Sequence, residues 1–199
     1  MRRMLAAAAV SWLAGTLAAR ADESVVVALT DSTPNFSMHM PDGSFKGINV
    51  EVAAQVCARL RLHCRFQPMP LVALVAQVRD GKAQIGFGNL AKTAEREQFM
   101  LFSRPYWRST SVFVGRRELA GKSTADLVRG RKVAVQEGSR QAKWLHENFG
   151  QTTTLVSRPT IFDVLATLPL HQADLALAPM MTMHIVRSIS GMGHRALWP

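Results

Sequence analysis

Apolar residues in the first half of the chain follow two spacings, one typical of strands and one typical of helices. The sequence predicts three strands, at 25–29, 63–69 and 83–88. Apolar positions three and four residues apart predict two helices, at 47–60 and 71–81. Asn49 is the expected N-cap of the first helix, Pro68 is expected to stop the second strand, and Pro34, Pro41 and the turn Asp42-Gly43 predict a polar loop. The β-α-β-α-β order predicts a parallel, doubly wound layer.

The same order repeats after an extended segment, in which residues 112–114 are the predicted crossing strand. Strands are then predicted at 131–138, 152–157 and 173–179, and helices at 123–130, 139–150, 160–168 and 180–189. Two such units predict an α/β fold with two lobes, each a doubly wound sheet with flanking helices, and a cleft between them. Ligands bind at the carboxyl ends of strands in such sheets. Without a GxGxxG or GxxxxGK[ST] pattern, a nucleotide site is not indicated.

The first 21 residues have the three parts of a secretory signal peptide. Arg2 and Arg3 form a basic start, residues 4–19 are small and apolar with few exceptions, and Ala19-Arg20-Ala21 is a cleavage pattern. An uncleaved N-terminal anchor is the alternative. We therefore expect a periplasmic protein with a signal peptide at 1–21, a first lobe at 22–110, a second lobe at 111–190 and a C-terminal tail at 191–199.

The basic balance of the chain does not indicate nucleic acid. Of 24 Lys and Arg, three lie in the signal, so 21 remain against 14 Asp and Glu, a net charge of +7. The sequence has no long basic run and no zinc-finger or RNP pattern, and an exported chain rarely meets nucleic acid. A solvated basic surface explains the charge, and a basic cleft for an anionic ligand is compatible with it.

The two cysteines, Cys57 and Cys64, favour a disulfide because an even count in an exported protein usually means pairing. Cys57 falls near the end of a predicted helix and Cys64 at the start of the next strand, so a bridge would tie the two together. A metal site is disfavoured, since His63 is the only other ligand type nearby. We expect no metal and no cofactor.

A short helix predicted after Thr93 carries an arginine where a positive charge is disfavoured. Thr93 has the chemistry of an N-cap and Glu95 suits the first turn, but Arg96 lies among the free backbone N–H groups of the helix start. Either Arg96 is a solvated surface residue, or it supplies parallel N–H donors to a carboxylate ligand beside those backbone N–H groups.

The chain resembles the family 3 bacterial extracellular solute-binding proteins, the periplasmic receptors of polar amino-acid ABC transporters. The resemblance covers nearly all of the mature chain and rests on four stretches: ALTDSTPNF, DGSFKGINVEVAAQVCARL, GNLAKTAEREQFMLFSRPYW and GRKVAVQEGS. The third is the most specific. VCARLRLHC also resembles the disulfide-bearing stretch of the lysine/arginine/ornithine and histidine receptors in this family.

The resemblance implies a set of ligand-binding residues. It implies that Arg96 grips the ligand carboxylate, with the backbone N–H of Ala91 and a carbonyl or amide of Asn89 beside it, and that Ser139 and Arg140 close on the carboxylate from the second lobe. Three further positions match residues that face the ligand side chain, each with a structural alternative: Asp31 as a turn residue, and Phe36 and Leu71 as core.

Several positions depart from the family pattern. Pro179 stands where the family has an aspartate for the ligand α-amino group, and Gln84 stands at another usual aspartate. Because a proline cannot pair with an ammonium group, we hypothesise a small carboxylate ligand that need not carry an α-amino group. The sequence also ends without the segment that returns to the first lobe in the family, which predicts an incomplete first lobe.

The expected function is therefore capture of a small carboxylate or amino acid for an ABC transporter permease in the inner membrane, by a monomer that is not an enzyme. The alternatives are a cyclohexadienyl-dehydratase-like lyase on the same fold and a non-functional truncated receptor. A lyase needs a positioned general acid in the cleft. Glu137 and His146 are the nearest candidates, and neither belongs to a known constellation.

Overall fold

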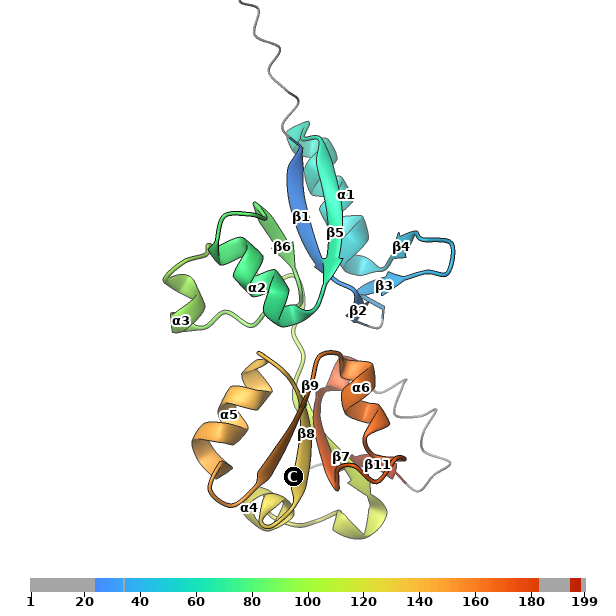
Figure 1. Ribbon diagram of the computed structural model, residues 1–199, viewed down its shortest axis with the longest axis vertical. Helices are drawn as coiled ribbons and strands as arrows, with labels where there is room; N and C mark the ends of the chain where they lie inside the picture. The colour runs from blue at the N-terminus through green and yellow to red at the C-terminus, as the bar shows by residue number, and fades with distance from the viewer. Residues whose placement is uncertain (1–23, 34, 183–193, 198–199) are drawn as a thin grey trace, which may run out of the picture.

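The structure, a computed structural model, describes residues 24–33, 35–182 and 194–197. Two α/β lobes are stacked along the long axis, and a single stretch of chain between β6 and β7 is seen to run from one to the other (Figure 1). This confirms the two-lobed α/β fold. The expected signal peptide and most of the helix expected at 180–189 lie outside the described residues.

Lobe 1 is built around a three-stranded parallel sheet with the order β5-β1-β6. Its main elements are β1 Val25–Thr30, α1 Ile48–Leu60, β5 Cys64–Met69, α2 Leu71–Arg79, β6 Ile85–Phe87 and α3 Ala94–Glu97. Helix α1 packs on one face through Ala53 and Cys57, and α2 packs on the other through Leu74. The sheet is therefore doubly wound, with three strands among the described residues.

Two local expectations for α1 and β5 are wrong. The N-cap of α1 is Gly47, not Asn49, because the first N–H groups of α1 donate to the carbonyls of Asn35 and Phe36. Gly47 has φ 128°, and a Cβ there would lie 2.5 Å from the Phe36 carbonyl oxygen. Pro68 does not stop β5, because β5 is an edge strand of the described sheet and a missing N–H is tolerated there.

The segment expected as a polar loop forms a small antiparallel sheet. Its strands are β2 Ser32–Thr33, β3 Ser37–His39 and β4 Phe45–Lys46, in the order β2-β3-β4. Asn49 is fully buried beside it and donates from Nδ2 to Ser37 Oγ at 3.0 Å. The small sheet and the start of α1 are thus held together by a buried side-chain hydrogen bond.

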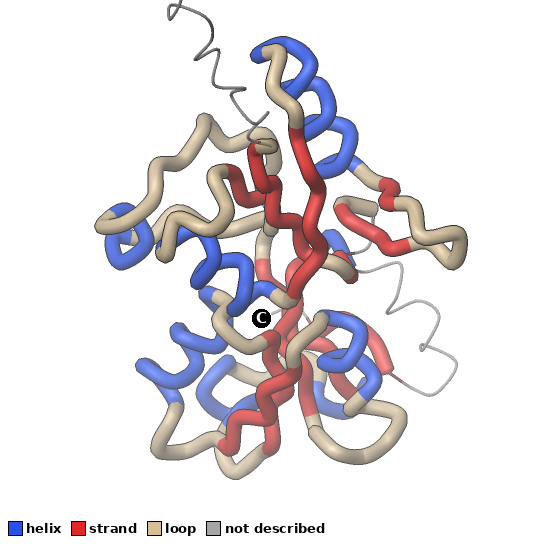
Figure 2. The backbone as a smooth tube through the Cα atoms, turned by 45° about the horizontal axis from the view of Figure 1, so that its top comes forward, coloured by secondary structure: helices blue, strands red, loops and turns tan. Residues whose placement is uncertain are grey.

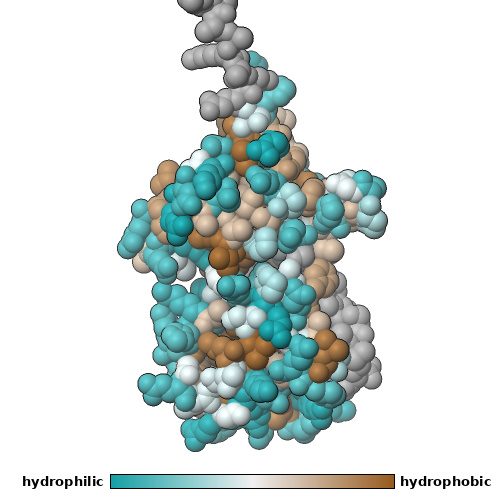
Figure 3. Space-filling model, viewed as in Figure 1, coloured by the Kyte–Doolittle hydropathy of each residue, from teal (hydrophilic) through white to brown (hydrophobic). Residues whose placement is uncertain are grey.

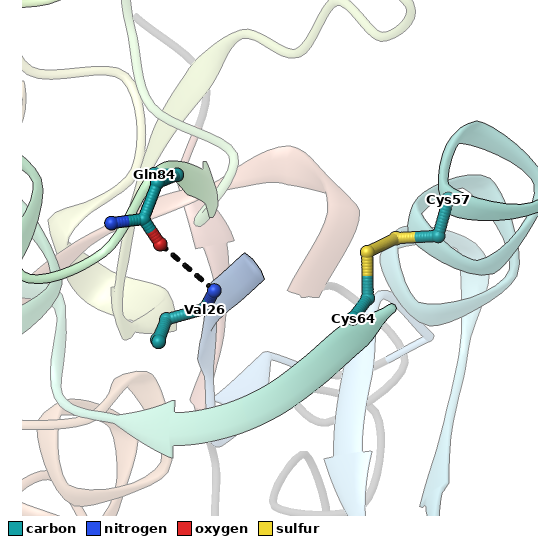
Figure 4. The surroundings of a disulfide bond; sticks show 4 residues. All are labelled: Val26, Cys57, Cys64 and Gln84. Carbon is teal, nitrogen blue, oxygen red and sulfur yellow. Dashed lines mark hydrogen bonds between the residues drawn. A yellow bond between two sulfur atoms is a disulfide. The ribbon is translucent and has the colours of Figure 1, made fainter. Parts of the chain in front are cut away.

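The disulfide between Cys57 and Cys64 is confirmed. It joins the last turns of α1 to the first residue of β5, with an S–S distance of 2.02 Å and a Cα–Cα distance of 6.2 Å (Figure 4). On the other side of β1, Gln84 accepts a hydrogen bond from the Val26 backbone N–H at 2.9 Å (Figure 4). Gln84 therefore serves the structure of the sheet.

Lobe 2 contains a five-stranded sheet with the order β11-β7-β10-β8-β9. Its elements are β7 Ser111–Arg116, η1 Arg117–Leu119, α4 Thr124–Val128, β8 Lys132–Gln136, α5 Arg140–Phe149, β9 Thr154–Arg158, α6 Ile161–Ala166, β10 Leu175–Pro179, η2 Met180–Thr182 and β11 His194–Leu197. Strands β10, β8 and β9 are parallel, and β7 and β11 run antiparallel to their neighbours β10 and β7. Residues expected as a tail thus contribute β11 to this sheet.

Helices cover both faces of the lobe 2 sheet as well. Helix α6 packs on one face through Val164 and Leu165, and α4 and α5 pack on the other through Leu127 and Leu145. In the turned view, helices flank the strands of both lobes (Figure 2). The surface in Figure 3 is mostly hydrophilic, with smaller apolar patches. Within the described ranges, no helix is long and apolar enough to cross a membrane.

Candidate ligand-binding site

Arg96 lies buried where the two lobes meet. Thr93 caps α3 as expected, since its Oγ1 accepts a hydrogen bond from the Arg96 backbone N–H at 3.3 Å. The guanidinium donates from Nη1 to the Ala91 carbonyl at 2.9 Å and from Nη2 to the Gly138 carbonyl at 2.8 Å. Only 9% of the residue is exposed, which excludes the solvated surface arginine.

The Arg96 guanidinium is a buried cation whose two hydrogen-bond partners are both neutral carbonyls. Burial lowers the pKa of Arg96, and the nearby charge of Glu95 opposes that effect. Among the described residues no carboxylate forms an ion pair with Arg96. Because a buried cation is stabilised most by a charge-assisted partner, this position suits an anion with two oxygens.

Lobe 2 approaches this position closely through the turn between β8 and α5. Gly138 has φ 67°, and a Cβ there would lie 2.8 Å from Cγ2 of Val72 in lobe 1. An ion pair also spans the lobes, with Lys143 Nζ 2.9 Å from Glu95 Oε2. This contact lowers the pKa of Glu95 and raises the pKa of Lys143. The carbonyl of Gly138 is therefore held beside Arg96 by contacts on both sides.

Ser139 and Arg140 follow Gly138 at the start of α5. Ser139 is half-buried and caps the helix, accepting a hydrogen bond from the Ala142 backbone N–H at 3.1 Å. Arg140 is the exposed first residue of α5. Their place beside Gly138 brings them to the same junction as Arg96, and direct contact with a ligand stays a prediction.

Asn89 connects the loop after β6 to lobe 2. It has φ 50°, and its Oδ1 accepts from the Tyr106 hydroxyl at 3.4 Å. The same hydroxyl donates to Asn49 Oδ1 at 2.8 Å, and burial raises the pKa of Tyr106. Asn89 Nδ2 lies 3.9 Å from the sulfur of Met181 in lobe 2. The loop that carries Ala91 is thus tied to α1, to lobe 2 and to the interlobe segment, residues 106–110, which leads into β7.

Asp31, Phe36 and Leu71 are placed less directly. Asp31 is half-buried directly after β1. Phe36 is 2% exposed and packs edge-on against Trp107, with ring centroids 5.1 Å apart. Leu71 is buried as the first residue of α2. Within the described residues, the hydrogen bonds of the Arg96 guanidinium reach Ala91 and Gly138 and none of these three.

Sequence reasoning missed three participants in this site: Gly138, Lys143 and Tyr106. Gly138 precedes the N-cap Ser139. A glycine at this strand-to-helix turn was the one local signal that the turn packs closely against another part of the chain. Lys143 pairs with a residue 48 positions earlier, so no local spacing indicates the contact. Tyr106 lies in the FSRPYW stretch, but its acceptor Asn49 was interpreted as a cap.

The fold and this junction define a two-lobed binding protein of the periplasmic-binding-protein type. A model of bacterial extracellular solute-binding proteins, family 3, matches residues 25–180, and the chain belongs to that family.

Relatives and solved structures agree with this assignment. The chain is 28% identical over 156 residues to the putative ABC transporter arginine-binding protein 2 of Escherichia coli K12, covering 78% of this chain and 62% of the relative. It is 22% identical to the arginine-binding periplasmic protein of Mannheimia haemolytica, over 60% of this chain and 48% of the relative. An ancestral arginine-binding protein bound to glutamine matches with a TM-score of 0.78 and 18% identity, covering 88% and 78% of the two chains.

The chain spans only part of these relatives, 62% and 48% of their lengths. A 30% identical stretch of 134 residues is also shared with the virulence sensor protein BvgS of Bordetella bronchiseptica, covering 67% of this chain and 11% of the sensor. The shared architecture therefore occurs both in proteins named for binding and in a protein named for sensing.

Proposed function

We propose that this chain is a periplasmic solute-binding protein that captures a small carboxylate or amino acid for an ABC transporter permease, and that it binds its ligand without transforming it. The observation that carries the proposal is the buried guanidinium of Arg96 at the junction of the lobes. Two relatives named for arginine binding, one of them also named as periplasmic, support the same class of role.

The binding event replaces the neutral partners of Arg96 by a charged one. A carboxylate offers two oxygens that match the two donors now directed at the carbonyls of Ala91 and Gly138. Ser139 and Arg140, at the start of α5, approach the same carboxylate from lobe 2. Movement of one lobe against the other about the stretch between β6 and β7 then opens and closes the site.

The finer proposal is that the ligand need not carry an α-amino group. Pro179 ends β10 at the side of lobe 2 that faces the junction, and it offers no charge to an ammonium group. Glu95, the carboxylate next to Arg96, is already paired with Lys143. An ammonium group buried there without a carboxylate partner would cost several kcal/mol, the effective desolvation penalty of an unpaired ion in a protein.

Thermal melting of the purified chain with a panel of amino acids and small organic acids tests the proposal, because a ligand of the native state raises the melting temperature. The expected result is an upward shift with at least one carboxylate that Arg96→Met abolishes. Arg104→Met, at an exposed arginine, is the matched control and keeps the shift.

Two results would contradict the proposal. If the ligand still raises the melting temperature of Arg96→Met, the guanidinium does not hold the ligand. Selective binding of α-amino acids over the matched organic acids removes the finer proposal while leaving solute binding intact.

A further inference from the structure

A second feature lies next to the Arg96 junction, at the point where the interlobe segment meets the end of β10. A cavity of about 360 Å³ opens there, and the described residues that line it are Trp107, Arg108, Ser109, Thr110, Met180 and Met181. Two thioethers and an indole give it mostly apolar walls, and the exposed Arg108 adds a cationic side chain to the lining. That volume is at the lower end of small-molecule sites.

The cavity walls are held by contacts that do not depend on a ligand. Trp107 packs edge-on against the buried Phe36, with ring centroids 5.1 Å apart, and keeps 48% of its surface exposed. Met180 is anchored by its backbone N–H, which donates to the Thr110 carbonyl at 2.8 Å. An aromatic face that is fixed on one side and exposed on the other is suited to stacking with a second ring.

The cavity is connected to the Arg96 position through one short loop. Met181 lies 3.9 Å from the amide of Asn89, and Asn89 is two residues from Ala91, whose carbonyl contacts Arg96. Two residues of extended chain span at most about 7 Å. Arg96 and the cavity residue Met181 therefore contact the same loop, residues 89–91, and an elongated ligand lying along this loop would meet both.

We infer that this cavity is the side-chain subsite of the ligand, and that the ligand is a carboxylate joined by a short spacer to an aromatic or branched aliphatic group. The inference rests on the proposed solute binding and specifies its substrate class. Methionine sulfur packs favourably against aromatic rings, and the Trp107 indole adds an aromatic surface to the lining. Both arginines, Arg96 and Arg108, favour an anion over a neutral or cationic molecule.

The test measures binding of phenylpropionate to the purified chain by calorimetry and by tryptophan fluorescence. Propionate lacks the ring, phenylpropanol lacks the charge, and arginine carries a polar, cationic side chain, so these three are the comparison probes. Phenylpropionate is expected to bind at least tenfold more tightly than each of them, because it alone combines a carboxylate with an apolar ring.

Three variants locate the binding on the chain. Met181→Gln puts a polar amide in the apolar wall and is expected to weaken phenylpropionate about tenfold. Trp107→Phe is expected to remove the fluorescence change on binding. Trp144→Phe, at a partly exposed tryptophan of α5, is the matched control and keeps it.

The possible failures are distinguishable. If arginine or another polar carboxylate binds through Arg96 and Met181→Gln has no effect, the subsite is wrong and solute binding stands. If propionate binds as tightly as phenylpropionate, the cavity adds nothing and the subsite is wrong. If a chain that melts cooperatively binds none of the carboxylates, both the subsite and the proposed function are wrong.

Discussion

The contact between the lobes at Gly138 can be tested by adding a single methyl group. In Gly138→Ala the new Cβ would lie 2.8 Å from Cγ2 of Val72, a distance that real Cβ atoms do not show. Val72 is β-branched and lies in α2, so its side chain has little rotamer freedom to retreat. Relief must come from a shift of the β8–α5 turn away from lobe 1, which lengthens the 2.8 Å bond from Arg96 to the Gly138 carbonyl.

The loss of stability in Gly138→Ala has two parts, backbone strain and overpacking, and a second glycine with a similar φ allows them to be separated. Gly138 has φ 67° and Gly130 has φ 69°, but a Cβ at Gly130 meets nothing within 4 Å. Both alanine variants lose about 1–2 kcal/mol from the left-handed backbone. Gly138→Ala alone loses a further 1–3 kcal/mol or so from overpacking, together with the weakened Arg96 bond. At roughly 2–4 °C per kcal/mol, its melting temperature should lie about 2–12 °C below that of Gly130→Ala.

The assay is thermal melting of both variants, with small-angle scattering to follow the separation of the lobes. Gly138→Ala should have the larger radius of gyration. Val72→Ala removes the atoms that the methyl group would meet, so adding it to Gly138→Ala should restore both readouts to those of Gly130→Ala. Equal melting and equal scattering of the two single variants would refute the interlobe contact.

Three further measurements test the rest of the structure. Reduction of the Cys57 disulfide should cost about 2 kcal/mol, seen as a lower melting temperature with reductant and no such effect in Cys57→Ser. Gln84→Ala removes the acceptor of the Val26 N–H and should lower the denaturant midpoint by the equivalent of about 1 kcal/mol. The Glu95 pKa lies below its ordinary 4.5, so the stability gained from Lys143 is present above that pH and disappears as pH falls through the lowered pKa. The chain and Lys143→Gln should therefore differ near neutral pH and converge in acid, and a constant difference would contradict this.

Elements with a strong local period could be predicted from the sequence. The α1 positions Ala53 and Cys57 are four residues apart and face the same core, and Thr93 caps α3 through its own side chain. These signals are local, because helix periodicity and capping depend on residues within one or two turns.

The errors arose where the decisive partner is distant in sequence. Asn49 has the chemistry of a cap, but its Nδ2 donates to Ser37 Oγ and its Oδ1 accepts from the Tyr106 hydroxyl. The strands β2 and β4 are two residues long, too short to show alternation. One donor of Arg96, Nη2, likewise meets the carbonyl of Gly138, 42 positions away, a contact that only the packing of the lobes creates.

The two donors of Arg96 connect closure of the lobes to binding. One donor holds a carbonyl of its own loop, at Ala91, and the other holds a carbonyl of lobe 2, at Gly138. A carboxylate that takes both donors must displace the Gly138 carbonyl, so the direct bond between the lobes is exchanged for one that runs through the ligand. Burial now lowers the Arg96 pKa, and a carboxylate partner would raise it again. The Arg96 guanidinium joins the lobes through a neutral carbonyl, so a ligand with a carboxylate would stabilise this buried cation more than the present partners do.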